Sequence, residues 1–156
     1  MKLGFIGTGT ITKAIVTGLI KSDYSFSSIY ISQRNKKVSS GLANLHEKIK
    51  ICEKNQEIIN NSDIIFLAVL PEQAEAVLKP LHFHDTAQIV SLIATVSLER
   101  ISQWTSQGAK ISRAVPLPTV LDHHGITTVY PPAECVEELF KHLGRVVPLQ
   151  SIEAFD

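Results

Sequence analysis

The first residues of this sequence whose spacing could support chemistry are two glycines near the amino terminus. Gly7 and Gly9 lie in the stretch GTGTIT, directly after the apolar run KLGFI. Between a strand and a helix, a first glycine permits a tight turn and a second lets a pyrophosphate approach the backbone, next to the free N–H groups of the helix. The spacing therefore favours a dinucleotide-binding turn over an ordinary turn. Thr12 stands where a third small residue is typical, and we expect it to shift the helix slightly.

A basic stretch further along the chain indicates which dinucleotide would bind. Residues 32–37 read SQRNKK, with three cations and no carboxylate. An NAD site typically has a carboxylate at this point for the ribose hydroxyls. Arg34 instead offers a bidentate fork, and Ser32 an extra donor, for a 2′-phosphate. Taken alone the stretch could be a solvated loop, but its place one strand after the glycine turn favours NADP(H).

These residues require strands and helices in alternation, and the sequence has that pattern. Short β-branched or apolar runs predict six strands, at 2–6, 28–32, 48–52, 64–70, 88–93 and 110–115, with helical segments at 10–21, 55–63, 71–81 and 97–108. The run at 64–70 does not alternate, as expected for a strand buried on both faces. We therefore predict an α/β fold, a doubly wound, mostly parallel sheet of the Rossmann type. GITTVY and RVVPLQ, around a last helix, predict one or two extra edge strands near the C-terminus.

Composition narrows the class of protein. The chain has 156 residues, 44% of them hydrophobic, and equal numbers of basic and acidic residues, 15 of each. This balance gives no electrostatic footprint for nucleic acid or for a membrane surface. Cys52 and Cys135 lie far apart, without the spacing of a metal or redox site. We expect a single dinucleotide-binding domain over 1–152, in a protein of the cytoplasm.

The chain as a whole resembles the cofactor domain of pyrroline-5-carboxylate reductases, within a wider group that includes deazaflavin-dependent NADP oxidoreductases. The resemblance is carried by KLGFIGTGTITKAI, NSDIIFLAVLPEQ and IVSLIATVSLERI, which occur in the family's order. It implies an NADPH-dependent reductase of a small cyclic imine, giving proline from pyrroline-5-carboxylate in a homo-oligomer. It also implies that 153–156 begin a helical domain that completes the dimer and the substrate pocket, so that this chain binds cofactor with little or no turnover.

The resemblance also assigns cofactor contacts, all of them near predicted carboxyl ends of strands. The pyrophosphate would lie against Ile6, Gly7, Thr8, Gly9, Thr10 and Ile11, the 2′-phosphate against Ser32 and Arg34, and the adenosine against Asn55. The ribose and nicotinamide would lie against Ala68, Val69, Leu70, Pro71, Leu92, Ile93 and Ala94. No catalytic acid or base and no metal ligand is assigned in this chain, because the cofactor carries the hydride chemistry.

Three departures from the family fall on the nicotinamide side. Leu70 stands for the usual lysine, Thr95 for a small residue, and Leu117 for the asparagine of a Pro-Asn-Thr-Pro segment. They leave two alternatives open. One is a related NADP oxidoreductase with another substrate, and the other is a non-catalytic module that senses NADP and regulates a partner.

Histidines offer weaker hypotheses. His82 and His84, like His123 and His124, could suggest metal ligands, but no third ligand stands at a matching spacing. Asp122, His123 and His124 follow the departing Pro-Leu-Pro-Thr segment and could face a substrate.

Overall fold

The computed structural model describes residues 1–106 and 108–151, and the predicted start of a second domain at 153–156 lies outside them. Strands and helices alternate through the first six strands, as the sequence predicts. The elements are β1 (Lys2–Ile6), α1 (Thr10–Ile20), β2 (Ser28–Ser32), α2 (Lys36–Ala43), β3 (Ile49–Cys52), α3 (Asn55–Asn61), β4 (Ile64–Leu67), α4 (Pro71–Leu78), β5 (Gln88–Ser91), α5 (Leu98–Trp104), β6 (Lys110–Val115), the 3₁₀ helix η1 (Pro118–Asp122), β7 (Gly125–Tyr130), α6 (Glu134–Lys141) and β8 (Gly144–Pro148).

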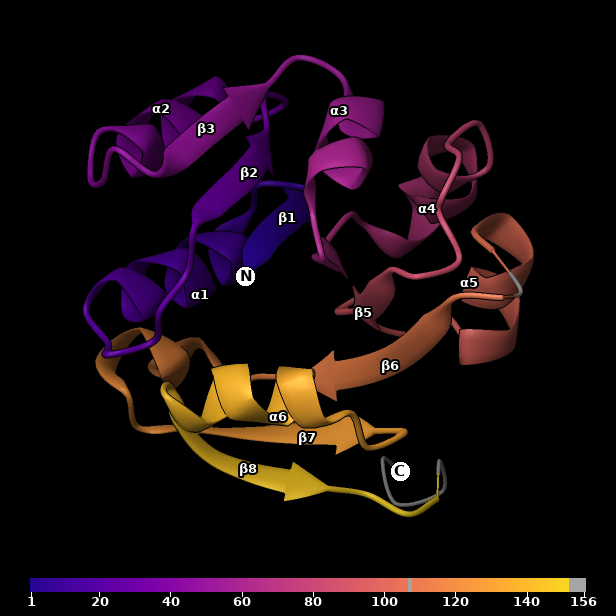
Figure 1. The fold of residues 1–156 in the computed structure, drawn as a ribbon. Coiled ribbons are helices and arrows are strands. Elements are labelled where there is room, and N and C mark those ends of the chain that lie inside the picture. The colour runs from indigo at the N-terminus through magenta and orange to yellow at the C-terminus, as the bar shows by residue number, and fades with distance from the viewer. Residues whose placement is uncertain (107, 152–156) are drawn as a thin grey trace.

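The strands form one sheet in the order β3-β2-β1-β4-β5-β6-β7-β8 (Figure 1). β1 to β6 are parallel, β7 runs antiparallel to β6, and β8 runs parallel to β7. The first six strands have the Rossmann order, which reverses between β1 and β4. The predicted α/β class, doubly wound and mostly parallel with added strands at the C-terminal end, is confirmed.

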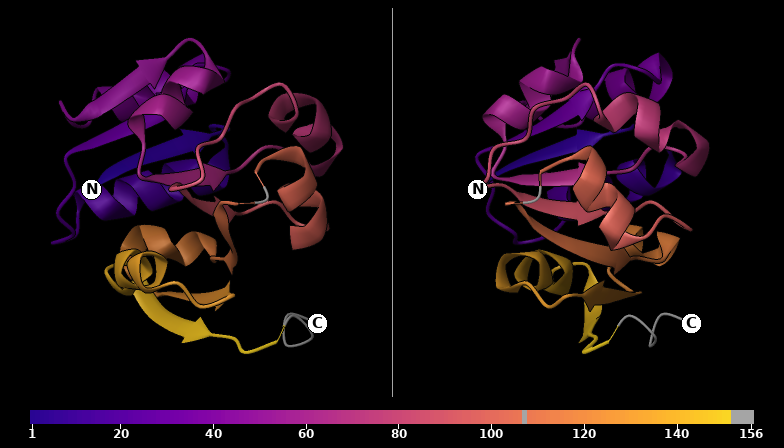
Figure 2. Two further views of the ribbon diagram at one scale, coloured as in Figure 1. Left: turned by 45° about the vertical axis from the view of Figure 1, so that its right-hand side comes forward. Right: turned by 90° about the vertical axis from the view of Figure 1, so that its right-hand side faces the viewer.

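Helices cover both faces of the sheet, each through its own hydrophobic core (Figure 2). α1, α2 and α6 pack on the face that carries Phe5 and Ile31, whereas α3, α4 and α5 pack on the face that carries Ile65 and Ile89. β4 buries all four of its residues, which explains why its sequence lacks alternation. Burial on both sides makes the sheet a rigid support for the loops at its edges.

An aromatic group ties the last helix to the centre of the sheet. The rings of Phe5 and Phe66 stack with centroids 4.5 Å apart, and Phe140 of α6 meets Phe66 edge-on at 6.2 Å. All three side chains are fully buried. Because Phe140 comes from the segment between β7 and β8, these contacts join the added strands to the parallel part of the sheet in one core.

The sequence pattern does not predict two of the helices, α2 and η1. α2 follows a cap in which the Asn35 side chain accepts a hydrogen bond from the N–H of Val38, at 3.2 Å. Its sequence KKVSSGLA holds few strong helix formers. The second is η1, which begins at Pro118 and ends where His123 takes a left-handed conformation, with φ 62°. α2 therefore depends on its cap, and η1 on its packing against α1, more than on an apolar period.

Two strands end earlier than predicted. β4 stops at Leu67 and β5 at Ser91, whereas the apolar runs continue to Leu70 and Ile93. The extra residues leave the sheet at its carboxyl edge and turn toward α4 and α5. Burial within the sheet therefore does not explain why these loop residues are apolar.

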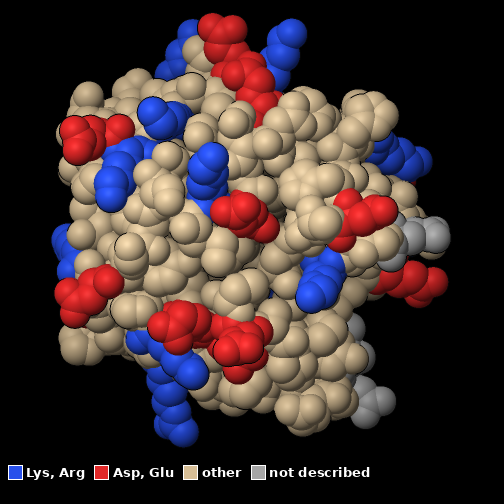
Figure 3. All heavy atoms as spheres, viewed as in Figure 1, with Lys and Arg blue, Asp and Glu red and all other residues tan. Residues whose placement is uncertain are grey.

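Figure 3 shows the molecule from the same side as Figure 1. Basic and acidic side chains are interspersed over this face, without an extended area of one sign. Within 1–106 and 108–151, the longest helices are too short and too polar to pass through a bilayer.

Candidate dinucleotide site

The turn between β1 and α1 has the backbone that the two glycines predict. Gly7 has φ +106°, and a Cβ there would collide with the backbone carbonyl of Ala68 at the end of β4. Gly9 is the N-cap of α1, and a Cβ there would meet no atom within 4 Å. Gly7 is thus required by its neighbours, whereas Gly9 leaves an open backbone surface at the start of the helix.

The amino end of α1 is free to bind an anion. No side chain caps this helix, and the first N–H groups of a helix have no partner within it. Together with the helix dipole, these groups favour a phosphate beside Gly9 and Thr10. The side chain of Thr8 is buried, and its hydroxyl meets the end of β2.

Thr12, the departure from the glycine pattern, is an integral part of the turn. Its side chain is fully buried, and its Oγ1 donates a hydrogen bond of 2.7 Å to the carbonyl oxygen of Gly7. The hydroxyl therefore links the first turn of α1 to the end of β1. The sequence alone indicated only the size of Thr12, whereas its polar contact depends on the geometry of the turn.

Hydrogen bonds connect the glycine turn to the end of β2. The N–H of Gly7 donates to Ser32 Oγ at 3.1 Å, and Thr8 Oγ1 donates to the Ser32 carbonyl at 3.3 Å. The N–H of Asn35 reaches Thr8 Oγ1 at 3.4 Å. Ser32 is buried, and its Oγ also lies 3.5 Å from Thr8 Oγ1, so its side chain holds the two loops together.

Three hollows lie along the carboxyl edge of the sheet and contain most of the residues assigned from the sequence. One of about 320 Å³ includes Gly7, Thr8, Gly9, Arg34, Ala68, Val69 and Leu70. One of about 260 Å³ includes Ser32, Arg34 and Asn55, and one of about 300 Å³ includes Ile11, Leu92, Ile93 and Ala94. Arg34 borders the first two. Along the edge of the sheet, the hollow at Ser32 comes first, the hollow at the glycine turn second, and the hollow at Ala94 third. An extended dinucleotide would meet them in that order with its adenosine, its pyrophosphate and its nicotinamide.

Three assigned residues do not line these hollows. The side chain of Ile6 is buried in the core, Thr10 is the first residue of α1, and Pro71 is the first of α4. Residues that were not assigned as cofactor contacts line the same hollows, among them Gln33, Asn35 and Lys36 of the basic stretch, and Glu53, Gln73, Arg113 and Pro116. Many of them directly follow a strand or begin a helix, and that position is the signal that could have identified them.

The part of the carboxyl edge around Ala94, which the family resemblance assigns to the nicotinamide, is more apolar than the part around Arg34. Leu70 and Leu117 are 56% and 48% exposed, and Pro116 and Pro118 line the hollow beside Ala94. Thr95, which follows Ala94, has φ +65°, an unusual conformation for a β-branched residue. The departures from the family therefore lie on or next to this end of the site.

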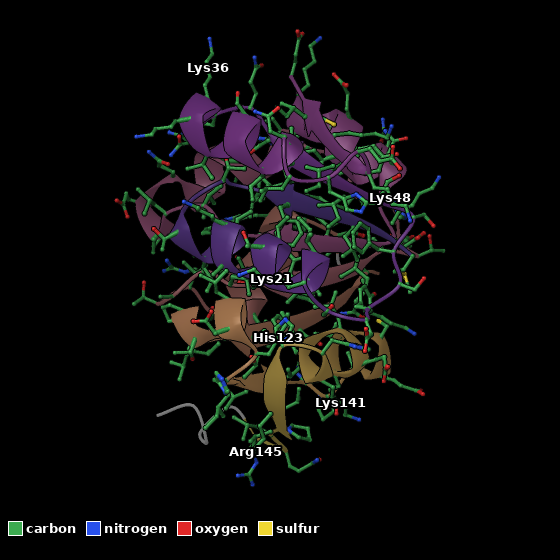
Figure 4. All side chains as sticks on the ribbon, turned by 90° about the vertical axis from the view of Figure 1, so that its left-hand side faces the viewer. Lys21, Lys36, Lys48, His123, Lys141 and Arg145 are labelled. Carbon is green, nitrogen blue, oxygen red and sulfur yellow. The ribbon has the colours of Figure 1, made fainter. Side chains whose placement is uncertain are left out.

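His123 belongs to the scaffold. Its Nε2 lies 2.8 Å from the carbonyl oxygen of Gly18 in α1, and since a carbonyl only accepts, the nitrogen donates. Figure 4 shows His123 beneath α1. Ser22, whose N–H would continue the helix, donates to Leu19 instead, so His123 satisfies the Gly18 carbonyl. The interpretation of His123 as a substrate contact is wrong, because η1 folds back onto α1.

A larger hollow, of about 960 Å³, lies at the other edge of the sheet. It is bordered by Gln88 and Lys110, the first residues of β5 and β6, and by Glu134 and Cys135 of α6. Ligands of open α/β sheets bind at the carboxyl ends of the strands, and the glycine turn lies there too. The large hollow therefore lies at the edge opposite the glycine turn, where open α/β sheets do not typically bind ligands.

The two cysteine thiols ionise less readily than a free cysteine does. Burial raises the pKa of the Cys52 thiol and also that of Cys135, which lowers the thiolate fraction at neutral pH. No cluster of three or more His, Cys, Asp or Glu side chains suited to a metal ion occurs in the described part of the chain.

Strand order, glycine turn and edge hollows together define a Rossmann domain with a dinucleotide site. Residues 2–96 match the family described as NADP oxidoreductase coenzyme F420-dependent, and the chain belongs to this family. Pyrroline-5-carboxylate reductase of Escherichia coli is 34% identical over 139 residues, which are 85% of this chain and 50% of that protein. The enzyme of the same name from Haemophilus influenzae is 27% identical over 93% of this chain and 56% of its own length. The chain thus spans about half the length of these relatives.

Solved structures give the same picture of the fold. Pyrroline-5-carboxylate reductase from Streptococcus pyogenes superimposes with a TM-score of 0.83 at 26% identity, covering 99% of this chain and 60% of that one. The pyrroline carboxylate reductase of Plasmodium falciparum with NADP bound gives 0.80 at 20% identity, over 96% and 58% of the two chains. At 20% identity, the likeness to the Plasmodium falciparum structure shows the fold alone.

Proposed function

We propose that this chain is the NADP(H)-binding part of a reductase that converts a small cyclic imine, pyrroline-5-carboxylate, to proline. The observation that carries the proposal is the open glycine turn at the start of α1, in a chain that belongs to an NADP oxidoreductase family. The relatives named as pyrroline-5-carboxylate reductases supply the substrate class.

The cofactor would extend along the carboxyl edge of the sheet. The pyrophosphate would lie on Gly9 and the amino end of α1, where backbone N–H groups are available. The 2′-phosphate would enter the hollow lined by Arg34 and Lys36, and Asn55 would contact the adenosine. Ser32, whose hydroxyl also meets Gly7 and Thr8, would contact the 2′-phosphate from the wall of that hollow.

The nicotinamide end would lie on the loops after β4 and β5. Ala68, Val69 and Leu70 would flank the ribose, and Leu92, Ile93 and Ala94 would support the ring. When bound, NADPH supplies the hydride that reduces the imine carbon. The chain's own contribution is to orient the ring and to exclude water from one of its faces with apolar residues.

The remainder of a substrate pocket would come from outside these residues. Relatives have about twice the length of this chain, and a reductase must hold the imine within about 3–3.5 Å of the nicotinamide. We therefore propose that this chain binds NADPH but turns over little, and that the active protein is a homo-oligomer. Free cysteines fit a reducing compartment, and we assign the protein to the cytoplasm.

Two measurements on the purified chain test the proposal. NADPH and NADH are titrated separately by fluorescence, and NADPH oxidation is then followed with pyrroline-5-carboxylate. We expect tighter binding of NADPH than of NADH, and turnover far below that of an intact reductase. Equal affinities would contradict the 2′-phosphate assignment, and rapid turnover would show that the active site lies within this chain.

The exposed leucines favour a second candidate, an NADP-dependent reductase of a less polar imine. Leu70 and Leu117 stand where the family resemblance leads us to expect a lysine and an asparagine. An apolar surface there would favour a substrate without a carboxylate. Comparison of carboxylated and uncarboxylated cyclic imines in the complete protein distinguishes the two candidates, since the first requires the carboxylated compound to react faster.

A further inference from the structure

Glu53 lies beside the residues proposed to hold the 2′-phosphate, although it comes from a different loop. β2 and β3 pair in parallel with Ser32 opposite Cys52, so the next residues, Gln33 and Glu53, leave the sheet side by side. Both line the hollow of about 260 Å³ that contains Arg34. The carboxylate that is absent after β2 is therefore supplied to the same hollow from β3.

The charges in this hollow are not paired with one another. Arg34, Lys36 and Glu53 all line it and are exposed, and within the described residues the ion pairs lie along α4 and α6. Figure 4 shows Lys36 projecting outward from the start of α2. The hollow thus presents two cations and one free carboxylate to a ligand.

We propose that Glu53 is a specificity-determining residue that weakens binding of the 2′-phosphate and so limits the preference for NADP(H) over NAD(H). The inference rests on the proposed NADP(H) site. A phosphate monoester carries a charge of about −1.5 to −2 at neutral pH, so a carboxylate in the same hollow repels it. A cube with the volume of the hollow has a side of about 6 Å, less than the screening length of about 8 Å at physiological ionic strength.

NADH responds differently to the same carboxylate. Its adenosine ribose has a neutral 2′-hydroxyl, which can donate a hydrogen bond to Glu53 but is not repelled by it. Removal of the negative charge should therefore improve NADPH binding and leave NADH binding equal or slightly weaker. A gain in NADPH affinity without a gain in NADH affinity separates a specificity residue from one that only changes the general affinity of the site.

The test is the dissociation constant of each cofactor for the wild-type chain and for Glu53→Gln. Glu47→Gln is the matched control, because Glu47 is also exposed but precedes β3 and so lies at the opposite edge of the sheet. We expect Glu53→Gln to bind NADPH about three- to tenfold more tightly, with NADH changed less than twofold and with Glu47→Gln unchanged for both. The gain should shrink as salt is added.

A second variant, Glu53→Lys, should increase NADPH affinity further, and thermal melting confirms that each variant is folded. Unchanged or weaker NADPH binding in both Glu53 variants would overturn the inference while leaving the proposed function intact. An equal gain in Glu47→Gln would also overturn it, since the effect would then be one of net charge. Failure of the wild-type chain to bind either dinucleotide would overturn the proposed function together with the inference.

Discussion

The hydroxyl of Thr12 donates a 2.7 Å hydrogen bond to the carbonyl oxygen of Gly7, within the turn that opens α1. Both residues are buried, so the bond is shielded from water. Thr12→Val keeps the shape and removes the donor, leaving the Gly7 carbonyl without this partner. We expect a loss of about 1–2 kcal/mol in the free energy of unfolding. Urea denaturation measures it, with Thr10→Val, at an exposed position in the same turn, as the control. Equal stability of the two variants would show that the Thr12 bond contributes nothing.

His123 stabilises the packing of η1 on α1 through its hydrogen bond to Gly18. His123→Ala should lower the free energy of unfolding by about 1 kcal/mol, the usual net value of such a bond, and should leave NADPH affinity unchanged. His124→Ala, at the exposed neighbour, is the control for denaturant unfolding. A loss of cofactor affinity without a loss of stability would restore His123 as a ligand contact.

Thr95 adopts a left-handed backbone that glycine accepts without strain. A β-branched residue at positive φ costs of order 1–3 kcal/mol, and alanine retains much of that cost. Thr95→Gly should therefore be more stable than Thr95→Ala by about 1 kcal/mol, measured by chemical denaturation. The reverse order would mean that the residue does not hold this conformation in solution.

Arg34 borders both the hollow at the glycine turn and the hollow that contains Asn55, proposed above for the pyrophosphate and the 2′-phosphate. Arg34→Asp should weaken NADPH binding by about 1–3 kcal/mol and shift the preference toward NADH, because it replaces a charged donor with a repelling carboxylate. Lys37→Asp is the control, since Lys37 is exposed outside these hollows. A matching loss in the control would indicate a general electrostatic effect, and calorimetric titration of both cofactors separates the two cases.

Regular apolar patterns explain how much of the fold could be predicted. The unbroken apolar run at 64–70 predicts a buried strand, which the structure confirms at Ile64–Leu67, and the glycines predict the turn before α1, which is confirmed as a turn. α2 could not be predicted in the same way, because its serines and glycine have weak helix propensity and its start depends on the Asn35 cap.

Tertiary contacts explain what was missed in the site. Glu53 lines the same hollow as Arg34 only because β3 pairs with β2, and His123 meets Gly18 only because η1 returns to α1. In each case the two segments lie too far apart in the sequence for their contact to be predicted from the sequence. Residues within one turn, such as Gly7 and Gly9, could be assigned because their geometry is local.

The open backbone at Gly9 provides the most direct test of the central claim, that this turn binds the pyrophosphate of NADPH. Gly9 has φ −101°, which alanine tolerates, and no atom lies within 4 Å of the added methyl group. The decisive measurement is titration of wild type and Gly9→Ala with NADPH, beside their melting temperatures. The account predicts an unchanged melting temperature and a loss of NADPH affinity of at least tenfold, about 1.4 kcal/mol. Unchanged affinity in a folded Gly9→Ala chain would contradict it.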